Sequence, residues 1–308
     1  MNPLSLLIRR QKQSLRPAET ALPRLREACR LAESPTSVLI LTHHKCATTF
    51  ITRMLQHLES QPGPLRCVDY EDLLWNHGAA LAVNARCGGP SQLLETMRNH
   101  LFSERGFVYG PLRSGCSIGY DDRFKRLFIL RDPRDSLVSR FFSITHSHAQ
   151  PVDPAVLRLF RHERSLARQE CIDNYVLRAA TTWLQPLLAS YRGMIVDSTR
   201  NVRIVQYEDL VNDPLTVVQD MLTYITGVEP HRDAVTRMLA NETFVQPAEA
   251  AGRHQRSGRP DQYHERLRPE TIDRLDDILR EELAFFWPHA TARAATIPPA
   301  SFRLRAAA

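Results

Sequence analysis

The chain has 308 residues, of which 43% are apolar and 24% charged, as is typical of a globular protein with a substantial core. The net charge of +6 comes almost entirely from arginine, because lysine occurs only at Lys12, Lys45 and Lys125. No apolar run reaches the roughly 18 residues that a membrane-spanning helix needs, and the cysteines form no C-x-x-C pair. These features argue against a transmembrane segment, a disulfide framework and a structural zinc site, and they predict a cytoplasmic protein.

Short apolar runs alternate along the chain with longer segments of helical periodicity. The sequence predicts a peripheral helical segment at residues 1–35, one domain at residues 36–290 and a tail at residues 291–308. Within the domain, residues 151–192 are predicted to form a helical insertion. The strand-forming runs are 37–42, 65–70, 106–110, 126–130 and 202–207. This alternation predicts an α/β fold in which helices flank a central parallel sheet. Ligands of such sheets bind beyond the carboxyl ends of the strands, so the residues that follow each strand are the candidate site.

The first strand ends at "HHKCATT", residues 43–49, where a helical pattern begins at once. The first amides of a helix have no intrahelical partner, and the helix dipole favours an anion there. Lys45 adds a positive charge and Thr48 and Thr49 add hydroxyl donors, so the turn predicts a cradle for a phosphate or sulfate group. Alternatively, Thr48 only caps the helix and Lys45 is solvated. The loop lacks glycine and the pattern G-x-x-x-x-G-K-[ST], which argues against ATP bound in the usual way.

The fourth strand ends in the same manner, within "RLFILRDPRDSLVSRFF". Arg131 stands at the strand tip, Pro133 suits the first turn of a helix, and Ser139 lies on that helix. A guanidinium and a hydroxyl placed in this way can converge on one phosphate. The alternative is a surface ion pair between Arg131 and Asp135, with no ligand.

Four segments together resemble the sulfotransferase family, in the family's order. "HHKCATTF" is similar to its P-K-S-G-T-T-W loop, and "RDPRDSLVS" to its R-x-x-x-D-x-x-x-S segment at identical spacing. "VQYEDLVNDPLTVVQDML" resembles the segment that carries Y-E-D-L, and "RSGRPDQYHERLRPE" the late R-K-G-x-x-G-D-W-K segment. The resemblance is closer to the bacterial and carbohydrate-type branches than to the cytosolic phenol and steroid branch. It implies a P-loop-like α/β fold and transfer of a sulfuryl group from 3′-phosphoadenosine 5′-phosphosulfate (PAPS), without a metal.

The resemblance also implies roles for individual residues. Those expected to hold the 5′-phosphosulfate are Lys45, Cys46, Ala47, Thr48 and Thr49, with Lys45 also stabilising the leaving group. Those expected at the 3′-phosphate are Arg131 and Ser139, covered by Arg256, Ser257 and Gly258. Those expected at the adenine are Phe50, Tyr207 and Phe244.

The chain departs from the family motifs at several positions. His44 replaces a proline, Ala47 a glycine, Ser257 a lysine, Asp261 a glycine and Tyr263 a tryptophan. An alanine fits the first loop only if the backbone at residue 47 avoids positive φ.

The general base is the least defined part of the predicted site. The K-x-H base of the cytosolic branch is absent, since Val108 and Gly110 occupy those positions. The related branches often use a carboxylate after the second strand, which makes Glu71 the first candidate and Asp69 the second. His148 is the third. Either carboxylate could instead cap the following helix.

Several alternatives stay open. Cys46 beside a lysine at a helix N-terminus could be a nucleophile, but His43 and His44 precede it on the wrong side of the turn, which favours a buried loop residue. A small-molecule kinase would need an acid for magnesium, for which Asp132 is the only faint candidate. A polyanion-binding protein would need a contiguous basic stripe, whereas "RHERSLARQE" intersperses arginines with acids. The expected acceptor is a small molecule, carbohydrate or lipid, which Arg113 could recognise, and no nucleic acid is expected.

Overall fold

The computed structural model describes residues 34–61, 63–72, 75–76, 102–113, 123–197, 200–246 and 257–288. The predicted tail at 291–308, residues 1–33 of the predicted peripheral segment, and Arg256 lie outside the described residues. The elements are β1 (Val38–Thr42), α3 (Thr48–Ser60), β2 (Arg66–Val68), β3 (Phe107–Leu112), β4 (Lys125–Leu130), α6 (Pro133–Phe142), the π-helical turn η1 (Ser143–Ser147), α7 (Pro154–Gln169), α8 (Ile172–Ala179), the π-helical turn η2 (Ala180–Leu184), α9 (Gln185–Asp197), β5 (Val202–Gln206), α10 (Tyr207–Asn212), α11 (Pro214–Thr226), α12 (Arg232–Leu239), α13 (Tyr263–Arg266), α14 (Pro269–Ile278) and α15 (Arg280–Phe286).

All five predicted strands are present, and they form one parallel sheet in the order β2-β3-β1-β4-β5. The pairing of β1 with β3 shifts register between Leu39 and Leu41, and Gly110 of β3 lies against β1 there. A Cβ atom at Gly110 would approach the Ile40 carbonyl oxygen to 2.7 Å, so only glycine fits this contact. The predicted parallel α/β sheet is therefore confirmed.

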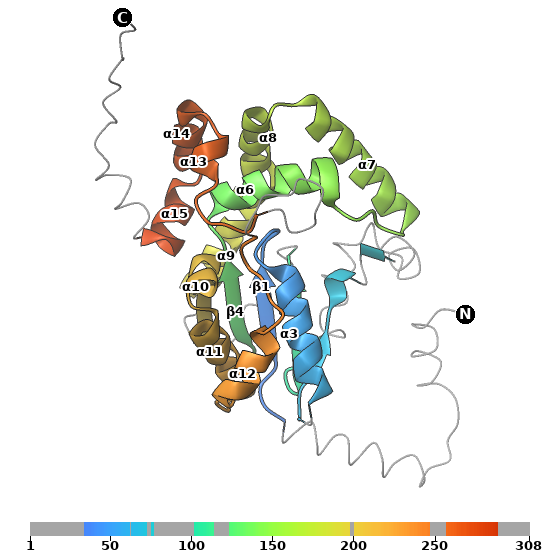
Figure 1. The fold of residues 1–308 in the computed structure, drawn as a ribbon, viewed down its shortest axis with the longest axis vertical. Coiled ribbons are helices and arrows are strands. Elements are labelled where there is room, and N and C mark those ends of the chain that lie inside the picture. The colour runs from blue at the N-terminus through green and yellow to red at the C-terminus, as the bar shows by residue number, and fades with distance from the viewer. Residues whose placement is uncertain are drawn as a thin grey trace, which may run out of the picture.

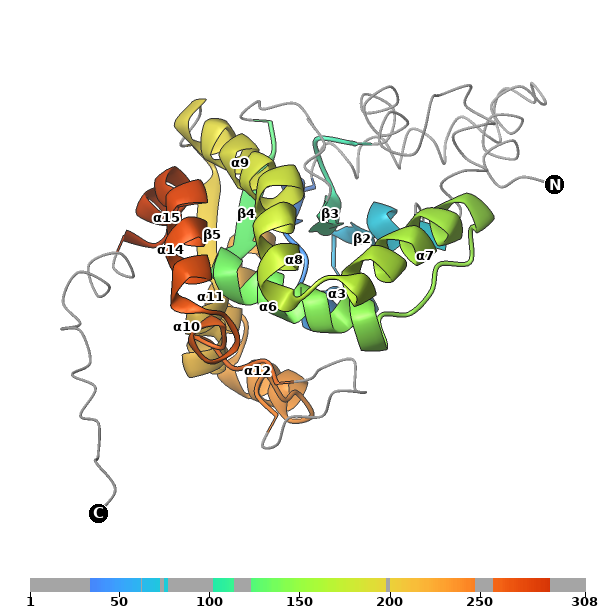
Figure 2. The ribbon, with the colours of Figure 1, turned by 90° about the horizontal axis from the view of Figure 1, so that it is seen from above.

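The two faces of the sheet carry separate apolar cores, because successive strand residues point to opposite sides. Val38 and Ile40 of β1 pack on one face with α3, α10, α11 and α12. Leu39 and Leu41 pack on the other face with α6, α8, α9 and the helices α13 to α15. Figure 2 shows α9 and α12 on opposite sides of the strands. The result is a three-layer arrangement, with helices on both faces of the sheet.

Local signals in the sequence set the ends of the helices beside the site. The Asp132 side chain caps α6 by accepting a hydrogen bond from the Arg134 amide at 2.9 Å, and Pro133 occupies the first turn. Because α6 follows β4 after two residues, it lies across the carboxyl end of the sheet (Figure 1). The apolar face of α3 buries Phe50, Ile51, Met54 and Leu55. Each such side chain contributes about 1.5–3 kcal/mol of stability.

The stretch from 154 to 197 is helical, as its lack of strand-forming sequence predicts. Its classification as an insertion stays a prediction. Within the described part of the chain, no helix has the length and apolar character needed to cross a membrane. The same residues bring together no group of three or more histidine, cysteine or acidic side chains that could hold a metal ion.

Candidate active site

The loop between β1 and α3 turns through two left-handed residues. Lys45 has a φ of 72° and Ala47 a φ of 55°, and Ala47 is the N-cap residue of α3. The condition that an alanine fits this loop only where the backbone avoids positive φ is therefore not met. The turn has to reverse the chain within a few residues, and the left-handed conformation does this even though it carries a steric cost for alanine. Asp261, which also replaces a family glycine, has a φ of 63°. The chain thus keeps the glycine backbone geometry at both positions without the glycines.

We expect the Ala47→Gly variant to be more stable than the native chain by about 1 kcal/mol, because glycine adopts a φ of 55° without steric strain. Thermal and denaturant unfolding would measure the difference. The Gly193→Ala variant is the reverse control, and we expect it to be more stable than the native chain. Gly193 lies within α9, where a Cβ atom would have no neighbour within 4 Å and alanine is the better helix former. An Ala47→Gly variant less stable than the native chain would show that the turn stores no relievable strain.

Cys46 lies under the loop, fully buried, with its Sγ 3.2 Å from the ring nitrogens of His43. The expectation that His43 lies on the wrong side of the turn is wrong, because the tight turn folds residue 43 back over residue 46. Burial raises the pKa of the Cys46 thiol to about 12 and lowers the pKa of His43 to about 4. The thiol therefore stays protonated and is not a nucleophile. Cys46 is therefore a buried loop residue, with none of its surface exposed.

His43 instead connects the two loops that the sequence predicts as phosphate sites. Its Nε2 lies 3.0 Å from the Arg131 carbonyl oxygen and 3.2 Å from the Arg131 amide nitrogen, and its Nδ1 lies 3.2 Å from the His44 carbonyl oxygen. The ends of β1 and β4 are thereby held in a fixed relation to each other.

The Arg131–Asp135 ion pair forms, with Nη2 3.6 Å from Oδ2, but the two side chains are only 3% and 0% exposed. A surface pair is therefore excluded. Burial raises the pKa of Asp135 to about 6, and the positive charge of Arg131 opposes that rise. Arg131 also donates to the carbonyl oxygens of Lys45 (3.4 Å) and Arg259 (3.0 Å). The Arg131 guanidinium thus contacts the β1–α3 loop, helix α6 and the loop that precedes α13 (residues 257–262, the late loop).

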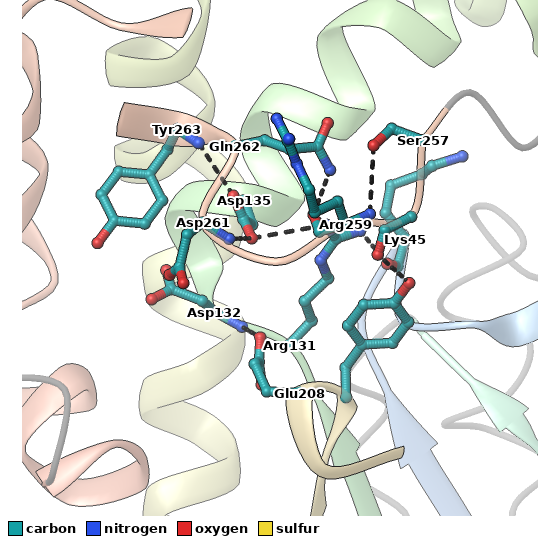
Figure 3. A network of polar contacts seen from close by, with 12 residues as sticks. Lys45, Arg131, Asp132, Asp135, Glu208, Ser257, Arg259, Asp261, Gln262 and Tyr263 are labelled. Carbon is teal, nitrogen blue, oxygen red and sulfur yellow. Dashed lines mark hydrogen bonds and ion pairs between the residues drawn. The ribbon is translucent and has the colours of Figure 1, made fainter. Parts of the chain in front are cut away.

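The late loop docks on the carboxylate of Asp135, which accepts hydrogen bonds from the amides of Asp261 (2.7 Å) and Tyr263 (3.0 Å). Figure 3 shows this carboxylate facing the loop that carries Asp261, Gln262 and Tyr263. The left-handed backbone at Asp261 turns its amide toward α6, which the sequence alone does not reveal.

Glu208, from the Y-E-D-L segment, stabilises the turn between β4 and α6. Its Oε1 accepts a hydrogen bond of 2.9 Å from the Asp132 amide, and burial raises the pKa of its carboxyl to about 7. Asp132 itself is held by Arg134, whose Nη2 donates to Oδ2 at 2.6 Å. Both acids therefore serve the turn between β4 and α6.

Aromatic residues form one end of the site. The rings of Phe50 and Phe244 meet edge to face with their centroids 4.9 Å apart, and the Arg131 guanidinium lies 4.5 Å from the centre of the Tyr207 ring. The Tyr207 hydroxyl donates to the Gly258 carbonyl at 2.5 Å. A Cβ atom on Gly258, whose φ is 75°, would lie 1.8 Å from the Phe244 carbonyl oxygen. The loop can approach Phe244 this closely only because residue 258 is a glycine.

These parts surround one cleft with about 970 Å³ of empty space, part of it open to solvent. The cleft is lined by Lys45, Ala47, Thr48, Thr49, Phe50, Arg131, Ser139, Tyr207, Phe244, Ser257 and Gly258, all predicted donor-binding residues. It is also lined by residues that the sequence analysis missed, namely Arg53, Phe142, Ser143, Ser147, Glu242 and Thr243. Ser143 lies four residues after Ser139, so helical spacing could have placed it on the same face. The Lys45 Nζ donates to its Oγ at 3.3 Å.

The three predicted bases occupy different environments. Glu71 lines a second cavity together with His44, Arg113 and Trp183. Asp69 accepts a hydrogen bond of 3.1 Å from the Asp72 amide, the contact of a capping residue.

His148 lies in an aromatic cluster and lines neither cavity. Its ring stacks on Trp75 at a centroid distance of 5.4 Å and meets Phe160 edge to face at 5.5 Å. At the K-x-H positions, Val108 is fully buried and Gly110 packs against β1, so neither offers a base.

Comparisons with known proteins agree with this geometry. A family model described as the sulfotransferase domain matches residues 35–286. The fold resembles that of mouse sulfotransferase SULT7A1 complexed with PAP, with a TM-score of 0.51 and 13% identity over 84% of this chain and 86% of that one. Sulfotransferase STF9 from Mycobacterium avium is 14% identical over 86% of this chain and 81% of its own, with a TM-score of 0.45. No curated protein matches the sequence. The family match spans most of the chain, and the chain therefore belongs to the sulfotransferase family.

Proposed function

We propose that this protein transfers a sulfuryl group from PAPS to a hydroxyl or amine of an acceptor by in-line displacement. The observation that carries the proposal is the convergence of the predicted donor-binding residues on one cleft. They come from five separate segments of the chain, and chance would not be expected to bring them to one surface. Mouse SULT7A1, whose fold is similar, was crystallised with PAP.

The cleft offers a place for each part of the donor. The Phe50 and Phe244 pair, whose rings meet edge to face, suits the adenine because an aromatic surface can stack on a flat base. Arg131 and Ser139 suit the 3′-phosphate, since a guanidinium provides paired donors and the hydroxyl a third. The N-terminus of α3, which has no side-chain cap, suits the 5′-phosphosulfate together with Thr48 and Thr49.

The chemistry requires charge to be balanced on the departing phosphate. As the bridging S–O bond breaks, its electron pair moves onto the phosphate oxygen. The Lys45 ammonium, which lines the donor cleft, can stabilise that charge without a metal. The second cavity, with about 850 Å³ of empty space, is the proposed place for the acceptor. Its mixture of Glu71, Arg113 and the Trp183 ring suits a small hydroxylated molecule, including a carbohydrate.

A small-molecule kinase is the weaker candidate. Asp132, the strand-end acid that the sequence offers for magnesium, caps α6 and pairs with Arg134. A polyanion-binding protein is also weaker, because the arginines of the helical region pair with acids, as in Arg140 with Glu163 and Arg178 with Glu170. We place the reaction in the cytoplasm on the strength of the described cysteines, which are all unpaired.

Calorimetric titration with adenosine 3′,5′-bisphosphate (PAP) and, separately, with ATP and magnesium tests the proposal. We expect micromolar binding of PAP and little binding of ATP, because Arg131 and Ser139 address a 3′-phosphate that ATP lacks. The reverse preference would favour the kinase. Binding of neither nucleotide would leave the cleft without a donor and refute the proposal.

A further inference from the structure

His44 stands between the donor cleft and the second cavity. It is the neighbour of Lys45 in the chain, but Lys45 lines the donor cleft whereas His44 lines the second cavity. The two cavities therefore meet this loop at consecutive residues, 44 and 45. The imidazole is half-buried, and its ring lies 5.3 Å from that of Trp183. Among the residues that the structure describes, none makes a hydrogen bond to this imidazole.

The acid at the second cavity is already engaged by Arg113. The Glu71 carboxylate accepts the Arg113 amide at 2.8 Å and faces the Arg113 Nε at 4.0 Å. This carboxylate is therefore already held by the Arg113 backbone amide and faces its guanidinium. Asp69 and His148 do not line this cavity. His44 is thus the basic group at the cavity that lies nearest Lys45 in the chain.

We propose that His44 is the general base that accepts the proton of the acceptor hydroxyl, an inference that rests on the proposed sulfuryl transfer. The acceptor oxygen attacks sulfur while its proton moves to the unprotonated imidazole nitrogen. The new O–S bond forms as the bridging S–O bond to the 5′-phosphate breaks, and PAP leaves with the electron pair. The imidazolium then returns its proton to solvent. Glu71 and Arg113 orient the acceptor.

The surroundings keep the imidazole in the required form. Burial lowers the pKa of His44 well below its usual value, and the positive charges of Arg140, Arg113 and Lys45 lower it further, as does His148 when protonated. Glu71 is the acid that faces the same cavity. A neutral imidazole at pH 7 has a lone pair ready to accept a proton.

The test uses water as the acceptor, since water fills an empty acceptor cavity. We would mix the full chain in excess with PAPS and follow PAP release by chromatography. Loss of a general base costs about 10²–10⁴-fold, so we expect His44→Gln to release PAP at least about 100-fold more slowly than the native chain. His57→Gln, the same change at an exposed site on α3, should match the native rate.

Two further readouts separate a base from a structural role. PAP affinity measured by calorimetry should be the same for His44→Gln and the native chain, and added imidazole should restore release by His44→Ala. A His44→Gln rate of PAP release within about threefold of the native rate would overturn the inference. So would failure of imidazole to restore release by His44→Ala, if Glu71→Gln is inactive. So would a native chain that binds PAP but releases none from PAPS. A native chain that does not bind PAP would instead refute the proposed function itself.

Discussion

Lys45→Ala is expected to abolish measurable sulfuryl transfer while leaving the fold intact. Removing one donor from a developing negative charge typically lowers kcat by about 10²–10³-fold, and Lys45 supplies a full charge there. The side chain lines the donor cleft and reaches Ser143 on η1, outside both apolar cores, so its loss should cost little stability. PAP release from PAPS, followed under single-turnover conditions, measures the effect.

Two controls make the Lys45 result interpretable. Circular dichroism and thermal unfolding should match the native chain, because alanine at residue 45 keeps the left-handed turn as it stands. Lys45→Arg keeps the charge but spreads it over a planar group, so it should retain part of the activity. Near-native turnover by Lys45→Ala would remove the proposed stabilisation of the leaving group.

Arg131→Ala is expected to weaken binding of PAP by about 100-fold or more, because two charge-assisted hydrogen bonds contribute about 3 kcal/mol. Binding of adenosine 5′-monophosphate, which lacks the 3′-phosphate, should change much less. Calorimetry with both nucleotides gives the comparison. Equal losses for the two nucleotides would show that Arg131 does not read the 3′-phosphate.

The buried position of Arg131 calls for a gentler companion variant. Arg131→Ala leaves the buried Asp135 carboxylate without its ion pair, and such a loss can cost about 3–5 kcal/mol of stability. Ser139→Ala removes one hydroxyl from the wall of the cleft and leaves that pair intact. We expect it to weaken PAP binding about fivefold, in line with about 1 kcal/mol for one hydrogen bond, and to leave 5′-monophosphate binding unchanged.

Part of the site could be found from the sequence because its geometry is local. A strand that ends at a helix N-terminus fixes where Lys45 and Thr48 stand, and a helix begun at Pro133 fixes Ser139 two turns on. The short apolar runs predicted all five strands, because a strand of this sheet packs one or both of its faces against a core. Ser143 was missed although the same helical period reaches it, because no motif drew attention to it.

Other features depend on contacts between distant segments. The left-handed backbone at Ala47 and Asp261 is imposed by the turn around them and by the docking of the late loop on Asp135, against the preference of both side chains. The engagement of Glu71 at the second cavity depends on its hydrogen bond with the Arg113 amide, and Arg113 lies 42 residues further along the chain.

The sequence by itself determined the parallel α/β fold, the family and the motif residues that line the donor cleft, because period, caps and motif spacing are properties of short segments. Only the tertiary structure decided that Cys46 is buried against His43, that the Arg131–Asp135 pair lies inside the protein, and that His44 faces the second cavity. Burial and long-range contact set those outcomes, and neither is encoded in any one stretch of the chain.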